Sequence, residues 1–320
     1  MQQLTGIHHV TAITSSAEKI YDFFNEILGM RLVKKTVNQD DINTYHLFFA
    51  DDEGNAGTDM TFFDFAGIQK GMHGTNEIAR TSFRVPSDEA VDYFVDRFNA
   101  FNVKHDGIKE QFGRKVLPFE DFDGQLYQII SDEHDNGVAP GKPWKNGPVP
   151  EAFGIYGLGP VVINISQFNA FKAAFETVYM FKETAVEGNQ HLFETGEGGN
   201  GASVIIVDQP EGPAGYQGFG TIHHVAFRVP DENGLNEWIE RLQGYGLPNS
   251  GYVDRFFFKS LYARLTAPLL FEIATDGPGF MGDEPYETLG EKLSLPPFLE
   301  PQREAIEAQV RPIDTVRSTK

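Results

Sequence analysis

The sequence contains no cysteine among its 320 residues, which excludes disulfide bonds and thiolate metal ligands. It has only 2 Trp beside 28 Phe, so aromatic contacts in the core must come mainly from phenylalanine. No apolar run approaches the ~18 residues that cross a bilayer, and the first residues, MQQLTGIHHV, lack the basic and apolar regions of a secretory signal. These absences favour a cytoplasmic protein that makes no membrane contact.

Basic residues are also few, because 26 Lys and Arg stand against 46 Asp and Glu, for a formal net charge of −20. A chain this acidic is a poor partner for nucleic acid, whose phosphates require a basic surface. The apolar content of 40% and the charged content of 22% are typical of a globular protein. The length allows two ordinary domains.

The chain repeats one structural unit. Residues 78–89 (IARTSFRVPSDE) and 222–233 (IHHVAFRVPDEN) share Ile, Phe, Arg, Val and Pro at an offset of 144 positions. The same offset, without a gap, superimposes residues 125–132 (QLYQIISD) on residues 269–276 (LLFEIATD). Matches at both ends of a segment without an insertion indicate duplication.

Two further copies begin at TGIHHVTAIT and, more weakly, at GLGPVVINISQ. We number the four copies as units one to four along the chain. In each, a short strand leads to a polar helix cap, an amphipathic helix and three more strands. Ser15 or Ser16 caps the helix of unit one and Gly29 ends it, while Ser87 and Asp231 cap the helices of units two and four. The repeated unit is therefore predicted to be βαβββ.

A stretch rich in Gly and Pro, residues 134–153, separates units two and three. We therefore predict an N-terminal domain at residues 1–140, with units one and two. A C-terminal domain at residues 153–276 holds units three and four. Residues 277–320 form a C-terminal tail with several prolines and one short helix.

This arrangement resembles the vicinal oxygen chelate superfamily, whose βαβββ modules pair into half-open barrels around a metal. Through the repeat, the resemblance spans nearly the whole chain. It implies an α+β fold in which four βαβββ modules pair into two half-open barrel domains.

Strand alternation indicates which side chains face the barrel cavity. In unit four the odd-numbered residues of 225–229 are apolar and suit a helix-covered face, so His224 points into the cavity. Unit one is built alike, which selects His9 over His8. Glu272, whose strand neighbours are apolar, points inward from the last strand. Two imidazoles and one carboxylate suit a divalent metal with open positions: Fe(II) for oxygen chemistry, with Mn(II) and zinc as alternatives.

These ligands come from units one and four, so the two units must meet. Arg80 and Gln128 occupy the corresponding positions of unit two, and Pro160 stands in unit three. Neither of these units can hold a metal, and one site per chain follows.

The stretches GIHHVT, YHLFFAD, TIHHVAFRVPDE and RFFFKSLYARLTAPLLFEIATDGPGF, with the tail LPPFLEPQREAIEAQ, resemble the hydroquinone-type ring-cleaving dioxygenases. That branch opens para-dihydroxylated aromatic rings with O₂ at Fe(II). The resemblance implies a small aromatic substrate and O₂ as partners, with metal ligands at His9, His224 and Glu272. It also places four further residues in contact with the substrate: His8, His223, Arg255 and Tyr262.

Alternation alone supports only part of this second set. Tyr262 shares a face with Ser260, but Arg255 has the wrong parity relative to Tyr262 for an unbroken strand. By the same rule His8 and His223 point away from the cavity, so they reach the site only through strand twist or a bulge.

Two other functions are compatible with the predicted fold. A glyoxalase-like lyase or isomerase uses four protein ligands, two of them carboxylates, and Asp64 is the only candidate for the second carboxylate. We assign Asp64 to the slot of unit one equivalent to Glu272, but expect three ligands to suffice. A non-enzymatic resistance or binding protein usually lacks a complete triad. The role of His46, in the cavity or in the core, and self-association into a homo-oligomer stay open.

Overall fold

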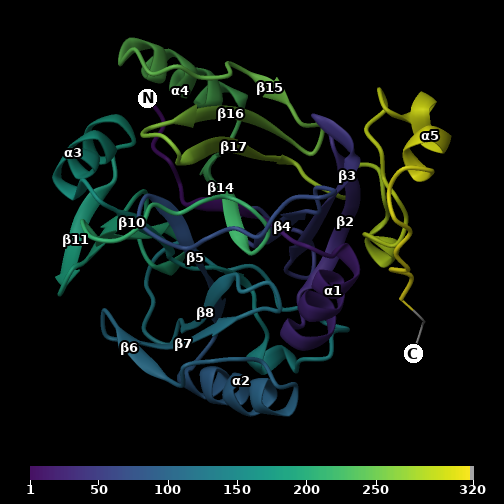
Figure 1. Ribbon diagram of the computed structural model, residues 1–320, viewed down its shortest axis with the longest axis horizontal. Helices are drawn as coiled ribbons and strands as arrows, with labels where there is room; N and C mark the ends of the chain where they lie inside the picture. The colour runs from purple at the N-terminus through teal and green to yellow at the C-terminus, as the bar shows by residue number, and fades with distance from the viewer. Residues whose placement is uncertain (318–320) are drawn as a thin grey trace.

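The computed structural model describes residues 1–317 and contains two curled, mixed β-sheets flanked by helices (Figure 1). The first sheet has eight strands in the order β15-β16-β17-β14-β1-β4-β3-β2. In that order their bounds are Val253–Asp254, Phe258–Arg264, Leu270–Pro278, Thr221–Val229, Ile7–Ile13, Asp59–Phe63, Asp41–Ala50 and Arg31–Asn38.

The second sheet has the order β11-β12-β13-β10-β5-β8-β7-β6, with the short β9 pairing with β5. The bounds are Lys182–Glu187, Gln190–Glu194, Ser203–Asp208, Val161–Ile165, Glu77–Val85, Leu126–Ser131, Arg114–Glu120 and Lys109–Gln111, with β9 at Gly157–Leu158. These sheets confirm the predicted α+β fold of four βαβββ units in two half-open barrels.

Each unit carries its helix where the sequence predicts one. The helices are α1 (Ala17–Asp22), continued by one π-helical segment η1 (Phe23–Leu28), then α2 (Asp88–Ala100), α3 (Phe168–Val178), α4 (Glu232–Gly244) and the tail helix α5 (Arg303–Glu307). Short 3₁₀ turns are η2 (Glu151–Phe153), η3 (Asn200–Ala202), η4 (Tyr286–Thr288) and η5 (Glu300–Gln302).

The predicted helix caps are present. Ser16, rather than Ser15, caps α1 by accepting the Lys19 N–H. Gly29 ends the first helix with φ = 69°, a left-handed conformation that glycine adopts at little cost. Among the helices described, none is long and apolar enough to cross a membrane.

The sheets pair units that are distant in the sequence. Strands of units one and four form the first sheet, joined by β1 and β14, and strands of units two and three form the second, joined by β5 and β10. Units one and four therefore meet, as predicted.

The aromatic core connects the units differently from the sheets. Phe24 of unit one packs on Phe62 in the first sheet and on Phe83 in the second, with ring centroids 4.9 and 5.8 Å apart. Phe181 of unit three likewise packs on Phe227 of unit four at 5.1 Å. The domain boundaries at 1–140 and 153–276 stay a prediction. The sheets pair units across these boundaries, whereas the aromatic contacts above join units within them.

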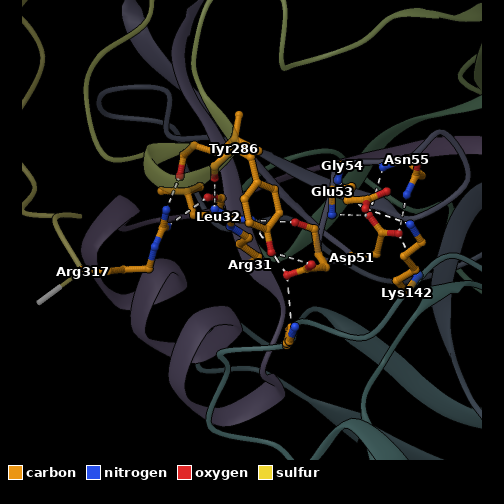
Figure 2. Close-up of polar contacts among 12 residues, drawn as sticks. Arg31, Leu32, Asp51, Glu53, Gly54, Asn55, Lys142, Tyr286 and Arg317 are labelled. Carbon is orange, nitrogen blue, oxygen red and sulfur yellow. Dashed lines mark hydrogen bonds and ion pairs between the residues drawn. The ribbon is translucent and has the colours of Figure 1, made fainter. Parts of the chain in front are cut away.

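The C-terminal tail runs beside β2 and β3, along the edge of the first sheet (Figure 1). The Ser294 N–H donates to the Lys35 carbonyl, so part of the tail pairs with the otherwise open side of β2. Figure 2 shows the same edge, where Tyr286 and Arg317 of the tail lie against Arg31 and Leu32. The tail thus protects an edge strand that would otherwise expose unpaired backbone groups.

Candidate metal centre

Three neighbouring strands of the first sheet bring His9, His224 and Glu272 together. The strands β1, β14 and β17 lie side by side, with His9 in register with Ala226 and Ala226 in register with Glu272. The Nε2 atoms of His9 and His224 are 3.3 Å apart. Each lies close to the Glu272 Oε2 atom, at 3.1 and 3.0 Å respectively. In residues 1–317 this is the one group of three such side chains close enough to share an ion.

The geometry of the three atoms fits a divalent ion. Adjacent ligands of an octahedral ion with bonds of ~2.1 Å lie ~3.0 Å apart, close to the separations found here. Glu272 Oε2 is buried and forms no hydrogen bond, although both imidazoles are within reach. Its Oε1 atom accepts the Ser260 hydroxyl at 2.5 Å. A buried carboxylate oxygen without a donor is costly unless a cation satisfies it.

A β-bulge accompanies each His-His pair. Along β1 and β14 the register shifts between Ile7 and His9, and again between Thr11 and Ala12 opposite His224 and Ile222. His8 is thus the extra residue of the first bulge and His223 the extra residue of the second. A bulge redirects the side chain of its extra residue. The first histidine of each pair therefore lies beside its neighbour, which faces the candidate metal site, and not on the helix-covered face.

The His8 ring determines which nitrogen of His9 is free. His8 Nε2 is 3.0 Å from the Thr275 carbonyl, which can only accept, so this nitrogen carries the hydrogen. Burial lowers the pKa of His8 to about 3, so the ring is neutral and its Nδ1 is an acceptor. His9 Nδ1, 2.9 Å away, must then donate. His9 Nε2 keeps a bare lone pair directed at the site, the state that a metal ligand requires.

His223 stands in the same relation to His224, with Nδ1 atoms 2.7 Å apart. Burial and, second to it, the adjacent His224 together lower the pKa of His223 to about 3. If the neutral His223 accepts at Nδ1, its Nε2 atom carries a hydrogen. His223 lines the cavity whereas His8 is fully enclosed behind His9, so only His223 can present a donor to a bound molecule.

The slot equivalent to Glu272 in unit one holds Thr61, which corrects our assignment of Asp64. Glu272 lies opposite Ala226, two residues after His224, and Thr61 lies opposite Thr11, two residues after His9. Asp64 instead follows β4 and accepts the Tyr45 N–H at 2.7 Å. Burial raises the pKa of Asp64 to about 6. The slot therefore holds no second carboxylate, in agreement with the expectation that three ligands suffice.

A cavity of about 380 Å³ opens over the three side chains. Its polar rim includes Asp40, Arg255 and Tyr262. Arg255 Nε donates to the Tyr262 hydroxyl at 3.0 Å, and the same guanidinium donates to Asp40 at 2.8 Å. Phe256 has φ = 70°, and this turn between β15 and β16 removes the parity conflict between Arg255 and Tyr262. The apolar lining is Phe48, Phe63, Phe257, Phe258 and Leu270.

His46 also lines the cavity, where its Nε2 is 3.0 Å from the Thr61 hydroxyl. That hydroxyl is 2.7 Å from the Thr11 hydroxyl, which lies 3.1 Å from His224 Nε2. Burial and, second to it, the neighbouring His9 hold the pKa of His46 well below its usual value. The sequence did not indicate either threonine, because Asp64 is the acidic residue nearest to the slot and was assigned to it.

The chain is similar to known proteins in both sequence and structure. Residues 6–129 match the model of the Glyoxalase/Bleomycin resistance protein/Dioxygenase superfamily. The chain is 41% identical to MhqA of Bacillus subtilis, named as a candidate ring-cleaving dioxygenase, over 97% of this chain and 99% of that protein. It is 29% identical to the chlorohydroquinone/hydroquinone 1,2-dioxygenase of Sphingobium indicum, over 93% and 94%. A crystal structure of a candidate dioxygenase from Bacillus subtilis matches with a TM-score of 0.90 and 34% identity, covering 99% and 100%.

Proposed function

Because this chain belongs to the Glyoxalase/Bleomycin resistance protein/Dioxygenase superfamily, we propose that it is an Fe(II)-dependent dioxygenase that opens hydroquinone-type rings with O₂. Relatives that match nearly its whole length are named as ring-cleaving dioxygenases, and the name of one specifies chlorohydroquinone and hydroquinone. The proposed metal ligands are His9, His224 and Glu272. A cytoplasmic location and self-association remain predictions.

The observation that carries this proposal is the three-ligand set with Thr61 in the fourth slot. Two imidazoles and one carboxylate on one face of an ion leave positions for a substrate oxygen and for O₂. A glyoxalase-like site would need a second carboxylate, and Thr61 cannot supply one. A protein that only binds its ligand, without catalysing a reaction, would not need all three metal ligands.

When bound, Fe(II) would make a coordinated phenol more acidic and provide O₂ with a neighbouring position. Residues of the protein orient the substrate ring and exchange protons with its oxygens. Tyr262 and His223 place an O–H and an N–H in the cavity, where they can exchange or share a proton with substrate oxygens. Arg255, held by Tyr262 and Asp40, offers positive charge to a developing anion. The phenylalanine walls exclude water from the ring.

The deciding experiment measures metal and oxygen uptake together. Protein purified without oxygen and loaded with Fe(II) or Mn(II) is mixed with hydroquinone, chlorohydroquinone, alkyl hydroquinones and catechol in an oxygen electrode. We expect one metal per chain and one O₂ consumed per hydroquinone opened. Absence of oxygen uptake with every ring, together with isomerisation of the thiol adduct of an α-ketoaldehyde, would reject the dioxygenase and support the glyoxalase-like alternative.

A further inference from the structure

A second apolar cluster, separate from the main core, fills the inside of the first half-barrel next to the metal centre. Two of its members come from the C-terminal tail, Phe280 and Leu289, with exposed fractions of 4% and 0%. The others come from the sheet and the β15–β16 turn: Val33, Phe48, Ala50, Ala226, Phe257, Phe258 and Ala274. The tail therefore plugs the barrel interior, where the sheet itself contributes mostly small side chains.

Phe280 packs directly behind two residues of the cavity wall. Its ring centroid is 5.0 Å from that of Phe48 and 5.5 Å from that of Phe257, and both of these line the cavity. The Gly279 N–H donates to the Phe257 carbonyl at 2.8 Å, so the tail also holds the backbone of this wall. Phe280 does not line the cavity itself, because Phe48 and Phe257 stand between.

A buried ion cluster fixes the plug in position. The Lys34 side chain is fully buried, and its Nζ atom is 2.8 Å from Asp283 and in contact with Glu284, both from the tail. The same Nζ atom lies 5.0 Å from the centre of the Phe257 ring, which adds a cation–π contact. Tyr286 donates to Asp52 at 2.7 Å. Its ring also stacks on Arg31, and the two side chains lie together in Figure 2. The chain is therefore anchored just before Phe280, at Gly279, and just after it, at Asp283 and Glu284.

We propose that Phe280 is a specificity-determining residue that sets the depth of the ring-binding cavity and thereby limits the apolar substituents accepted on the hydroquinone ring. This inference rests on the proposed function. The wall is made of phenylalanine, so the substituents in question are alkyl groups or halogens and not charged groups. A smaller residue at position 280 leaves space that a rigid sheet closes only in part. Phe48 or Phe257 can then move back and admit a larger group.

The experiment measures equilibrium binding without turnover. Hydroquinone and tert-butylhydroquinone are titrated without oxygen into the Fe(II)-loaded full chain by calorimetry, for the wild type, Phe280→Ala and Phe280→Leu. We expect the Phe280→Ala substitution to shift the ratio of the two Kd values toward the bulky ring by about 10-fold or more. Phe280→Leu should give an intermediate ratio, and it keeps the test valid if Phe280→Ala does not fold.

The matched control is Phe119→Ala, which removes an equally buried phenylalanine from the second half-barrel. It should leave the Kd ratio unchanged. An unchanged ratio in Phe280→Ala and Phe280→Leu, or an equal shift in Phe119→Ala, would overturn the inference and leave the proposed function intact. Normal binding with the expected ratio change, but no oxygen uptake, would reject the proposed function alone. A wild type that binds neither ring would reject both.

Discussion

At the scale of single residues, each histidine of the candidate metal centre depends on the residue before it. A bulge brings His8 to His9 and His223 to His224, with Nδ1–Nδ1 distances of 2.9 and 2.7 Å. Such contacts fix the tautomer and the ring plane of a ligand. The two pairs differ in their second nitrogen: His8 is tied to the Thr275 carbonyl, and His223 lines the cavity. His8 is thus suited to orientation, and His223 to contact with a bound molecule.

The first prediction concerns the ligand set. His9→Ala and Glu272→Ala should each abolish tight binding of a divalent ion, because each removes one of only three donors. Asp64→Ala is the control and should retain one ion per chain, since its carboxylate accepts the Tyr45 N–H. Metal content after dialysis, with circular dichroism to verify folding, checks both expectations. Full stoichiometry in the His9→Ala, Glu272→Ala double variant would contradict the assignment.

A second prediction concerns Thr61. Thr61→Glu should place a carboxylate in the slot that mirrors Glu272, and thereby bind the ion about 10-fold more tightly while closing a position needed for substrate or O₂. Metal competition with a chelator measures the affinity, and the oxygen electrode measures the loss of uptake. Thr61→Ser, which keeps the hydroxyl, should behave like the wild type. Equal chelator sensitivity of Thr61→Glu and wild type would show that the slot does not face the ion.

A third prediction concerns Tyr262. Its hydroxyl accepts from Arg255 and lies in the cavity, so Tyr262→Phe removes a proton donor while keeping the ring that faces His224. We expect kcat to fall ~10²-fold with metal content unchanged. Steady-state oxygen uptake gives kcat, and elemental analysis gives the iron content. A variant with wild-type kcat would exclude Tyr262 from the rate-limiting proton transfer.

At the scale of elements, the edge strand β2 depends on the tail for more than edge protection. Lys34 of β2 has no exposed side-chain area and contacts Asp283 and Glu284. Burying an ammonium group is tolerated only with such partners, and removing one partner of a buried pair typically costs a few kcal/mol. The tail is therefore part of the folded first half-barrel and not an appendage to it.

This gives a fourth prediction. Lys34→Met should lower the free energy of unfolding by about 3 kcal/mol, because it leaves two carboxylates without their cation. The control is Lys104→Met, which breaks a pair with Glu120 in which the lysine is 73% exposed. That change should cost less than about 1 kcal/mol. Urea unfolding followed by tryptophan fluorescence measures both, and equal effects would show that the buried cluster adds no stability.

At the scale of the whole molecule, the site exists only where distant parts of the chain meet. His9 lies in unit one, whereas His224 and Glu272 lie in unit four, and the two units share one sheet through β1 and β14. The predicted N-terminal domain would, when alone, expose the long edges of β1 and β5. Exposed strand edges of this kind favour association with another chain.

The fifth prediction follows from this topology. Fragments 1–145 and 146–320, cut between the exposed Lys145 and Asn146, should each fail to bind metal tightly and should assemble when mixed. The mixture should bind one ion per pair of fragments, as measured by size-exclusion chromatography with metal analysis. Stoichiometric metal on fragment 146–320 alone would show that His9 is not required.

The sequence alone was sufficient to predict the four units, most of the helix caps and the grouping of His9, His224 and Glu272. Repeats and period-two alternation are local properties, so the 144-residue offset, Asp231 as a cap and the inward positions of His224 and Glu272 can be read from neighbouring residues. Register and packing are not local. Only the tertiary structure revealed the two bulges, the place of Thr61 in the fourth slot and the turn that brings Arg255 to Tyr262. The plug formed by Phe280 depends on the path of a tail that pairs with β2, about 250 residues away in the chain. No periodicity encodes such contacts, because they arise from the complementarity of surfaces that meet only after folding.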